Sequence, residues 1–362
     1  MNKTLVPTNL INLYLTKKYP ISLIHFLTNR CNARCPFCFI DFDNKHSQSA
    51  KNEMSLEQID QFTKSLGPSL QHVNLTGGEP FLKKEIFDIV SLYFNNAKLD
   101  SILINTNGSL PKLIKKFINR FINEYPNKKC VFVFSIDAEN EKHDEIRKIP
   151  GLFKKVIESC NIVKGYTPNA HGVVNLTCTL DNYNVVCSLY DNLIDKYNIT
   201  CFSPIIVRDE GVYKIPEEDK KTILKSYSLL TTKIINDLKS GRIQGFDDSL
   251  MGRYLNAKNQ IQYDIIKNTY LEQKFESYCP AGSIFGVIMS DGTVFPCEVL
   301  DKPLGNLKDY DYDFLKLWFD SEAINTKKWI KDTKCNCHWE CAWTYNILSN
   351  VKYVPKLVNK ML

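Results

Sequence analysis

Three cysteines stand close together near the start of the chain, where their spacing is suited to metal chemistry. Cys31, Cys35 and Cys38 fall within the stretch NRCNARCPFCF. Three thiolates can hold three irons of a four-iron, four-sulfide cluster and leave the fourth iron open to an outside ligand. They can also hold zinc together with one histidine, for which His46 is a candidate. The spacing therefore predicts a metal site, and the iron alternative predicts one that binds a further molecule.

A second group of cysteines crowds the last third of the chain. Cys279 and Cys297 flank two strand-like runs that meet at Asp291-Gly292, a pair of residues favoured in the turn of a β-hairpin. Antiparallel pairing would return the two thiols to the same end of the hairpin. A fully ligated cubane needs four cysteines, and structural zinc also accepts four, so both metals remain open here. The further candidate ligands are Cys335, Cys337 and Cys341.

The cysteine content indicates a reducing compartment. The chain has 13 cysteines in 362 residues, an odd number, and its first residues show neither the compact apolar core nor the cleavage site of a signal peptide. We therefore expect a cytoplasmic protein whose cysteines bind metal rather than form disulfides. The cysteines outside the two groups are expected to be small buried hydrophobic residues, and they are Cys130, Cys160, Cys178, Cys187 and Cys201.

The overall composition narrows the class of protein further. Hydrophobic residues make up 44% and charged residues 24%, as in ordinary globular enzymes, and no apolar run approaches the roughly 20 residues of a membrane span. The net charge of +6 is spread over short lysine pairs rather than one dense block. This distribution does not favour a nucleic-acid partner. We expect no membrane association.

The elements that must position the first cysteines are predicted to be alternating strands and helices. One helix is signalled by the capping box of Ser55 and Gln58, which is followed by apolar residues at helical spacing. Near-continuous apolar runs separated by helical crossovers predict a parallel sheet buried on both faces. The six strand-like runs lie at residues 21–27, 72–76, 101–105, 130–135, 172–179 and 199–207.

Short polar motifs follow the ends of successive predicted strands. Barrel enzymes gather their sites from the loops at the carboxyl ends of their strands, so we expect an α/β fold with a partial (βα)6 barrel. The motifs are Gly77-Gly78-Glu79-Pro80 after residues 72–76, Thr106-Asn107 after 101–105, and Ser135 with Asp137 after 130–135, with Arg147 ten residues beyond Asp137.

Taken together, these residues resemble the radical S-adenosylmethionine (radical SAM) superfamily. Its signature is C-x-x-x-C-x-φ-C, in which φ is aromatic, and Phe37 occupies that position. The resemblance covers about residues 21–207. It implies a [4Fe-4S] cluster on Cys31, Cys35 and Cys38 whose open iron binds S-adenosylmethionine. Reductive cleavage of that molecule would give a 5′-deoxyadenosyl radical that abstracts a substrate hydrogen.

The resemblance also implies roles for the residues around this cluster. Phe37 would lie near the adenine, and the motif Gly77-Gly78-Glu79-Pro80 would contact the methionine amino group. The positions that would contact the ribose, the carboxylate or the neighbouring substrate are Thr106, Asn107, Ser135, Asp137 and Arg147, with Ser135 and Arg147 preferred.

No residue is assigned as the acid, base or second hydrogen donor that acts on the substrate. Four residues lie near enough to the motif loops or strands to be candidates, although each has a structural or exposed alternative. They are His143, Asp144, Cys178 and Glu298.

The C-terminal cysteines are similar to the SPASM and twitch extensions of radical SAM enzymes. Cys279, Gly292 and Cys297 match the opening of that module, which is a Cys, then a Gly, then a second Cys five positions later. The later cysteine group is shorter than the full SPASM pattern. The resemblance therefore implies one auxiliary [4Fe-4S] cluster on Cys279, Cys297 and two of the last three cysteines, with Cys337 and Cys341 preferred.

Four units are expected along the chain. Residues 1–20 form an N-terminal extension and residues 21–207 the barrel. A helical linker follows at residues 208–278, with one helix that starts at Pro216 and Glu217 and ends near Gly241, as capping preferences suggest. The cysteine-rich α+β unit occupies residues 279–362.

The predicted function is that of a radical SAM enzyme that modifies a peptide or protein. Modification of a small molecule, such as a sugar derivative or a tetrapyrrole, is the first alternative. A zinc-stabilised binding module without catalytic activity is the alternative of another class, and iron, sulfide and zinc analysis separates the two. The expected partners are the substrate and a reductant such as flavodoxin or ferredoxin.

Overall fold

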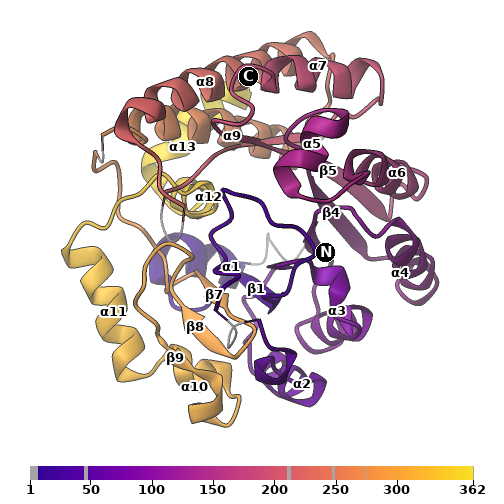
Figure 1. Ribbon diagram of the computed structural model, residues 1–362. Coiled ribbons are helices and arrows are strands. Elements are labelled where there is room, and N and C mark those ends of the chain that lie inside the picture. Colours follow the sequence, from indigo (N-terminus) through magenta and orange to yellow (C-terminus); the bar gives the residue numbers. More distant parts are fainter. Residues whose placement is uncertain (1–6, 45–47, 210–212, 247–248, 273, 362) are drawn as a thin grey trace.

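The computed structural model describes residues 7–44, 48–209, 213–246, 249–272 and 274–361, and its described strands form one sheet (Figure 1). The strand order is β6-β5-β4-β3-β2-β1-β7-β8-β9. Strands β1 to β6 run parallel to one another and curl into the predicted partial barrel. They are β1 (Ser22–Thr28), β2 (His72–Gly77), β3 (Ser101–Thr106), β4 (Lys129–Ser135), β5 (Ala170–Cys178) and β6 (Phe202–Ile206).

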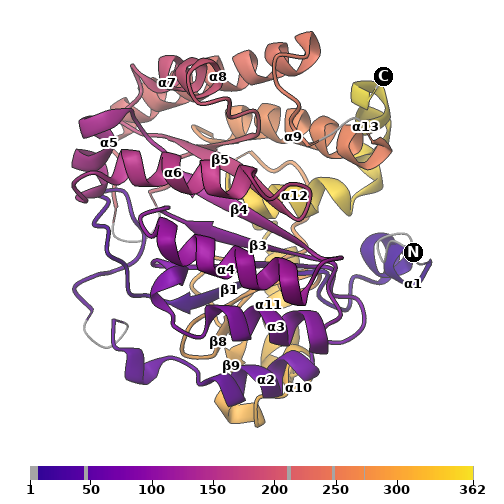
Figure 2. The same cartoon turned by 90° about the vertical axis from the view of Figure 1, so that its right-hand side faces the viewer.

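Amphipathic helices cover the outer face of this barrel (Figure 2). Helix α4, for example, buries Ile114, Phe117, Ile118 and Phe121 and leaves its lysines in solvent. The capping box of Ser55 and Gln58 is present at the start of α2, as predicted. The covering helices are α2 (Leu56–Lys64), α3 (Ile86–Asn96), α4 (Pro111–Glu124), α6 (Leu152–Lys164) and α7 (Val186–Asp195).

The inner face of the barrel is more polar than the outer face. In β2 and β3 the residues alternate between half-buried and fully buried, as expected where successive side chains point to opposite sides of a strand. Leu75 and Ile104 pack under the helices, whereas Asn74 and Asn105 are only half-buried and bond to each other, with Asn105 Nδ2 donating to Asn74 Oδ1 at 3.0 Å. The strands therefore present amide and hydroxyl groups to the interior.

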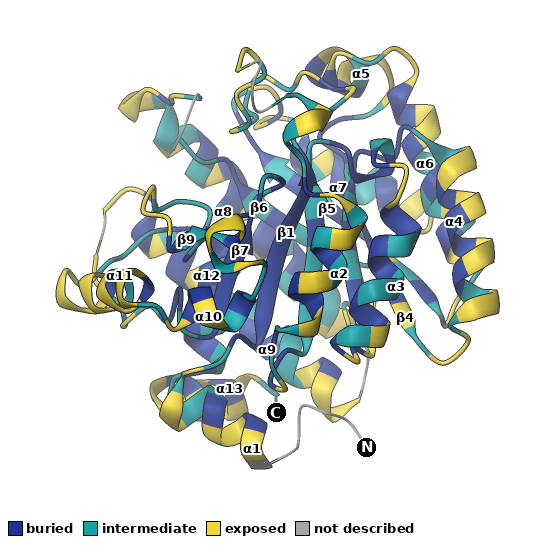
Figure 3. Ribbon diagram, turned by 90° about the horizontal axis from the view of Figure 1, so that it is seen from below, coloured by how far each residue is buried: buried dark blue, intermediate teal, exposed yellow. Residues whose placement is uncertain are grey.

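The C-terminal cysteine-rich region joins the same sheet. Strand β7 (Phe285–Ile288) pairs in parallel with β1 from Ser22 to His25, and β8 (Thr293–Phe295) and β9 (Gly305–Asn306) continue the sheet in antiparallel fashion. The predicted hairpin is present, and Gly292 supplies the positive φ of +89° that its turn requires. Strand β1 is consequently buried along its whole length (Figure 3).

Of the remaining helices, α8 packs against β5 and β6, and α9 packs against α8, α12 and α13. Helix α8 (Glu217–Ser240) ends at Gly241 in the left-handed conformation, so the helix predicted to start at Pro216 and Glu217 and to end near Gly241 is present. Among the described residues, no helix is long and apolar enough to cross a membrane. The other helices are α1 (Pro7–Ile11), α5 (Asn140–Arg147), α9 (Leu250–Thr269), α10 (Phe314–Trp318), α11 (Ser321–Asp332), α12 (Glu340–Leu348) and α13 (Val354–Met361).

Candidate active site

The loop that carries Cys31, Cys35 and Cys38 follows β1 and packs directly against the two glycines at the end of β2. Gly78 N donates to Thr28 O at 2.7 Å, and Glu79 N donates to Arg30 O at 2.9 Å. A Cβ atom on Gly77 would lie 2.1 Å from Thr28 O, and one on Gly78 would lie 2.1 Å from Arg30 O. Glycine at both positions is therefore required for the close backbone contact that holds the start of the cysteine loop.

Glu79 holds the ends of β2 and β3 together from behind this contact. Its carboxylate is fully buried and accepts hydrogen bonds from Phe81 N at 3.0 Å, Thr106 Oγ1 at 2.8 Å and Asn107 N at 2.8 Å. Burial raises the pKa of Glu79 to about 7, although these hydrogen bonds oppose the rise. Glu79 thus fixes the turn that presents Asn107 rather than lining the site itself.

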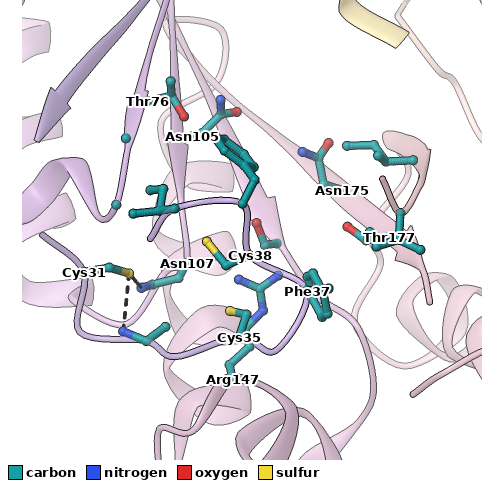
Figure 4. A pocket seen from close by; sticks show the side chains of 18 of the residues that line it. Cys31, Cys35, Phe37, Cys38, Thr76, Asn105, Asn107, Arg147, Asn175 and Thr177 are labelled. Atoms are coloured by element: carbon teal, nitrogen blue, oxygen red, sulfur yellow. Dashed lines mark hydrogen bonds between the residues drawn. The ribbon is translucent and has the colours of Figure 1, made fainter. Parts of the chain in front are cut away.

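The three thiols open onto a cavity of about 250 Å³ at the carboxyl ends of the barrel strands (Figure 4). Cys31 Sγ accepts hydrogen bonds from Ala33 N at 3.3 Å and Asn107 Nδ2 at 3.9 Å. Burial raises the pKa of all three thiols, and that of Cys31 to about 12. Donated hydrogen bonds of this kind favour a thiolate once a positive charge or metal replaces the proton.

The chemistry of the donor set fits a cubane cluster in this cavity. In the described part of the chain, no group of three or more His, Cys, Asp and Glu side chains is gathered closely enough to hold a single metal ion. A cubane makes a different demand, because each thiolate binds a different iron. His46, the candidate fourth ligand of a zinc site, lies outside the described residues.

A buried ion pair stands beside the thiols. Arg147 Nε donates to Asp137 Oδ2 at 2.6 Å, and Asp137 N donates to His143 Nδ1 at 3.2 Å. Asn182 Nδ2 donates to Asp137 O at 2.9 Å and completes the support of this loop. Burial lowers the pKa of His143 to about 4, so the imidazole is neutral at pH 7 and can accept the backbone hydrogen bond. In Figure 4 the Arg147 guanidinium points toward the thiols.

Most of the predicted site residues meet at this cavity. Glu79, Pro80 and Asp137 do not line it; Glu79 and Asp137 support residues that do, and Pro80 is buried at the start of a short 3₁₀ turn. The predicted residues that line the cavity are Cys31, Cys35, Phe37, Cys38, Gly77, Gly78, Thr106, Asn107, Ser135 and Arg147.

The structure adds site residues that sequence reasoning missed. Thr76, Asn105, Asn175 and Thr177 line the cavity from β2, β3 and β5. Their signal was present in the sequence, since each is a polar residue at an alternate position of an otherwise apolar strand. Glu53 had no such signal; it accepts hydrogen bonds from Thr28, Arg30 and Lys83 at the base of the cysteine loop, and these groups come from distant segments.

The C-terminal cysteines gather in a second apolar cluster around β7. Cys297 is buried beside Ala281 and Trp339, and its sulfur accepts a hydrogen bond from Leu300 N at 3.4 Å. All 13 cysteines of the chain are free. Of those predicted to be small hydrophobic residues, Cys130 and Cys178 are buried and the others are half-buried. The other cysteines that pack against this second cluster are Cys279, Cys335, Cys337 and Cys341.

One ion pair connects the two cysteine regions. Arg208 lines the cavity, and its Nη2 lies 3.1 Å from Oε2 of Glu298, the residue after Cys297. The Arg208 guanidinium also lies 5.0 Å from the ring centroid of Phe39 and 5.8 Å from that of Trp339. Burial raises the pKa of Glu298, and Arg208 opposes that rise. Glu298 is therefore a partly buried acid that is paired with a residue of the cavity wall.

The other acid and base candidates have structural surroundings. Asp144 accepts hydrogen bonds from Gly151 N at 2.6 Å and Phe153 N at 2.8 Å, at the start of α6. His143 is buried under the ion pair of Arg147, and Cys178 lies in the apolar core. None of the three lines the cavity.

Residues 26–185 of the chain match the family model described as "Radical SAM superfamily". The chain is 27% identical over 228 residues to a GTP 3′,8-cyclase of Clostridium perfringens, a match that spans 60% of this chain and 65% of that protein. It is 28% identical over 347 residues to a cysteine-type anaerobic sulfatase-maturating enzyme of Clostridium novyi, covering 88% of this chain and 84% of the relative. The chain thus spans just under two thirds of the first of these relatives.

Solved structures with the same fold cover nearly the whole chain. The structure of anSMEcpe with bound AdoMet aligns with a TM-score of 0.61 at 20% identity, over 94% of this chain and 92% of that one. Streptococcus suis SuiB bound to its precursor peptide SuiA aligns with a TM-score of 0.55 at 16% identity, over 85% of this chain and 66% of that one. At such identities the likeness supports the fold, including the partial barrel.

Proposed function

Because residues 26–185 belong to the radical SAM superfamily, we propose that this protein is a radical SAM enzyme that acts on a peptide or protein. The observation that carries the proposal is the cavity that three cysteine thiols share with the Gly77-Gly78 contact. Cys31, Cys35 and Cys38 would hold a [4Fe-4S] cluster there. When bound and reduced, such a cluster supplies one electron to S-adenosylmethionine, whose cleavage yields methionine and a 5′-deoxyadenosyl radical.

The residues around the cavity would bind and orient the cofactor. Arg147 Nε donates a hydrogen bond to Asp137. The two terminal nitrogens of Arg147 have no hydrogen-bond partner among the described residues. They would bind the carboxylate of S-adenosylmethionine, because a guanidinium recognises carboxylates through paired N–H groups. The hydroxyl of Ser135 would meet the ribose, and Phe37 would cover the adenine.

The neutral interior of the barrel supports a peptide substrate. Thr76, Asn105, Asn175 and Thr177 present amide and hydroxyl groups to the cavity. Both arginines that line it, Arg147 and Arg208, are paired with a carboxylate. Neutral hydrogen-bonding groups suit the amides of a peptide backbone. The names of two relatives agree, since one is a sulfatase-maturating enzyme and another is solved with its precursor peptide.

The C-terminal cysteines would hold one auxiliary [4Fe-4S] cluster that assists the substrate reaction. The ion pair of Arg208 and Glu298 would lie between this cluster and the substrate, with Glu298 placed to accept or return a proton. We infer a cytoplasmic protein, since free cysteines are typical of a reducing compartment. A small reductant protein such as flavodoxin or ferredoxin would supply the electron.

The test is anaerobic reconstitution with iron and sulfide, followed by metal analysis and an assay of 5′-deoxyadenosine after dithionite and S-adenosylmethionine are added. About eight irons per chain are expected, since each cubane holds four. Zinc without iron and without 5′-deoxyadenosine would contradict the proposal and favour the zinc-stabilised module. Four irons with zinc would keep the enzyme and assign the second site to zinc.

A second assay concerns the substrate class. One relative is a GTP 3′,8-cyclase, and its name supports the alternative of a small-molecule substrate. The rate of 5′-deoxyadenosine formation is compared with short serine- or cysteine-containing peptides, with nucleotides, with sugar derivatives and with tetrapyrroles. Stimulation by peptides alone is expected, and stimulation by small molecules alone would favour the alternative.

A further inference from the structure

A second hollow, which we call the lysine hollow, lies where the turn before β1 meets α10 and α11. Its volume is about 440 Å³, which is within the range of small-molecule sites. The cysteine loop follows β1, whereas this turn precedes it. In Figure 2, α1, just before the turn, lies at the right of the barrel and α5, which carries Arg147, lies at the left. The residues that line the lysine hollow are Lys17, Lys18, Tyr19, Phe319, Ile324 and Lys327.

The turn that carries two of these lysines is held in place by buried side chains. Asn12 is buried, and its Oδ1 accepts hydrogen bonds from Lys18 N and Tyr19 N, both at 3.0 Å. Asn12 Nδ2 also donates to Tyr19 O at 2.8 Å. On the other side of the turn, the buried Trp318 donates from Nε1 to Lys18 O at 3.0 Å. The backbone of the turn is therefore fixed before any ligand binds.

The third lysine reaches the lysine hollow from α11 and is held by the same tryptophan. Lys327 Nζ donates to Trp318 O at 2.5 Å. The ammonium lies 4.5 Å from the ring centroid of Trp318 and 5.6 Å from that of Phe319. The Phe319 ring in turn packs edge-to-face against Tyr19, with the centroids 5.3 Å apart. Trp318 thus joins Lys327 to the turn before β1, and one wall of the hollow is aromatic.

The positive charges of the lysine hollow are not neutralised by the protein. In the part of the chain that the structure describes, Lys17, Lys18 and Lys327 form no ion pair with a carboxylate. The carboxylate next to Phe319 in the sequence, that of Asp320, caps α11 and accepts a hydrogen bond from Glu322 N at 3.0 Å. Ammonium groups around one hollow repel one another, and an anion seated among them would remove this repulsion.

The form of the lysine hollow favours one class of anion. A polyphosphate concentrates several negative charges in one small group, whereas the carboxylates of an acidic peptide sit on separate residues. Lysine binds phosphate as a point charge. The side chains of Phe319 and Ile324 are exposed and give the hollow an apolar side on which a planar base can lie. Clustered ammonium groups beside an aromatic wall therefore favour a nucleotide over a peptide.

We propose that the lysine hollow is a nucleotide-binding site. Lys17, Lys18 and Lys327 bind the phosphates, and the base lies against Phe319 and Ile324. In the described structure the hollow shares no lining residue with the cysteine cavity. The proposal is therefore independent of the proposed function, and a nucleotide bound here leaves the cavity open to S-adenosylmethionine and substrate.

The experiment is a calorimetric titration of ATP into the full chain after anaerobic reconstitution and removal of excess metal. S-adenosylmethionine is present at saturation, so that the adenine of ATP does not enter the first cavity. Lys18→Glu reverses an exposed charge, and Lys327→Gln removes a charge but keeps a donor for Trp318 O. Lys302→Gln is the matched control, because Lys302 lies 4.8 Å from the ring centroid of Trp329 but does not line the lysine hollow.

ATP is expected to bind to the parent and to Lys302→Gln with equal affinity, and at least about tenfold more weakly to Lys18→Glu and to Lys327→Gln, since each loses a charged contact to phosphate. Phe319→Ala should weaken the binding of ATP and leave that of inorganic tripolyphosphate unchanged. Lys18→Glu alone decides the phosphate contact if Lys327→Gln fails to fold by circular dichroism, because Lys18 is exposed.

Four results would overturn the proposal. The first is a folded parent that does not bind ATP, and the second is equal affinity for ATP in the parent and in Lys18→Glu. The third is tripolyphosphate binding as tight as that of ATP with no effect of Phe319→Ala, which would indicate an adventitious anion only. The fourth is tighter binding of a glutamate-rich peptide than of ATP, which would make the hollow a peptide site. None of these results depends on cleavage of S-adenosylmethionine, which the 5′-deoxyadenosine assay measures separately.

Discussion

The two cysteine regions place similar ligands in different surroundings. Cys31, Cys35 and Cys38 lie on a loop at the edge of a cavity, held by backbone contacts to a glycine pair. The C-terminal cysteines lie in a packed apolar cluster with residues of β1, β7 and α12. The first arrangement leaves room for a molecule that must arrive, react and depart. The second surrounds its ligands with protein, as a permanent site requires.

Removal of one thiol at the open site should separate the two regions most sharply. Cys35→Ala is expected to abolish 5′-deoxyadenosine formation and to lower the iron content by about half, because a cubane bound through two thiolates is not retained. The C-terminal metal should remain. The control is Cys160→Ala, a half-buried cysteine on α6 away from both regions. Cleavage of S-adenosylmethionine by Cys35→Ala would contradict the assignment of the first site.

Removal of a thiol at the enclosed site should affect substrate conversion but not cleavage of S-adenosylmethionine. Cys297→Ala is expected to spare cleavage of S-adenosylmethionine and to stop conversion of the substrate. The two are measured by 5′-deoxyadenosine and by mass spectrometry of the substrate. Loss of cleavage together with a lower thermal midpoint would indicate instead that the second metal supports folding, and the comparison between a reactive and a permanent site would then need revision.

The glycine contact offers a way to damage the open site without touching a ligand. Gly78→Ala places a methyl group against Arg30 O and should displace the cysteine loop. We expect 5′-deoxyadenosine formation to fall at least about tenfold, since small displacements of reacting groups have costs of that order. Gly165→Ala is the control, because an added Cβ there meets nothing closer than 3.4 Å. Equal activity in the two variants would show that the loop does not depend on this contact.

Acid should weaken the barrel through its buried histidines. Burial lowers the pKa of His25 to about 3 and those of His72 and His143 to about 4, below the ordinary value of 6.5. As the pH falls below 6.5 the unfolded chain takes up these protons before the folded one, so the free energy of unfolding decreases. Between pH 6.5 and 5.5 the loss should be about 1 kcal/mol for each histidine.

Denaturant titrations at pH 6.5 and 5.5 measure this effect. His143→Asn keeps an acceptor for the Asp137 amide and should lose about 1 kcal/mol less than the parent between these pH values. All four tryptophans, Trp318, Trp329, Trp339 and Trp343, lie in the C-terminal region, so their fluorescence reports on that region and circular dichroism on the whole chain. We expect both signals to shift together because β7 pairs with β1. A shift in circular dichroism alone would mean that the two regions unfold separately.

The parallel part of the fold could be predicted because its strands carry strong local signals. Runs such as residues 101–105 and 130–135 are apolar and are followed by polar motifs, and the structure places β3 and β4 there. The pairing of β7 with β1 had no such signal, because register between strands more than 250 residues apart depends on tertiary packing. The same holds for residues 208–278, where the helix that ends near Gly241 was predicted from its capping residues, whereas the packing of α9 on α12 was not.

The residues of the candidate site also fall into two groups, those that could be predicted from the sequence and those that could not. Motif residues next to strand ends, such as Asn107 and Ser135, were found because parallel strands bring their ends together. Arg208 and Glu53 were not found, since nothing near them in the sequence marks them, and their roles arise only from partners far along the chain.

The pairing of β7 with β1 also bears on whether the C-terminal region can be removed or exchanged. Residues Ser22 to His25 bond to β2 on one side and to β7 on the other. A chain cut before Phe285 would leave this apolar strand with a row of unpaired backbone groups along one edge. Such an edge is a template for pairing with other chains. We therefore expect truncation to produce aggregates rather than a smaller working barrel, and the region is a part of the barrel's architecture rather than a detachable module.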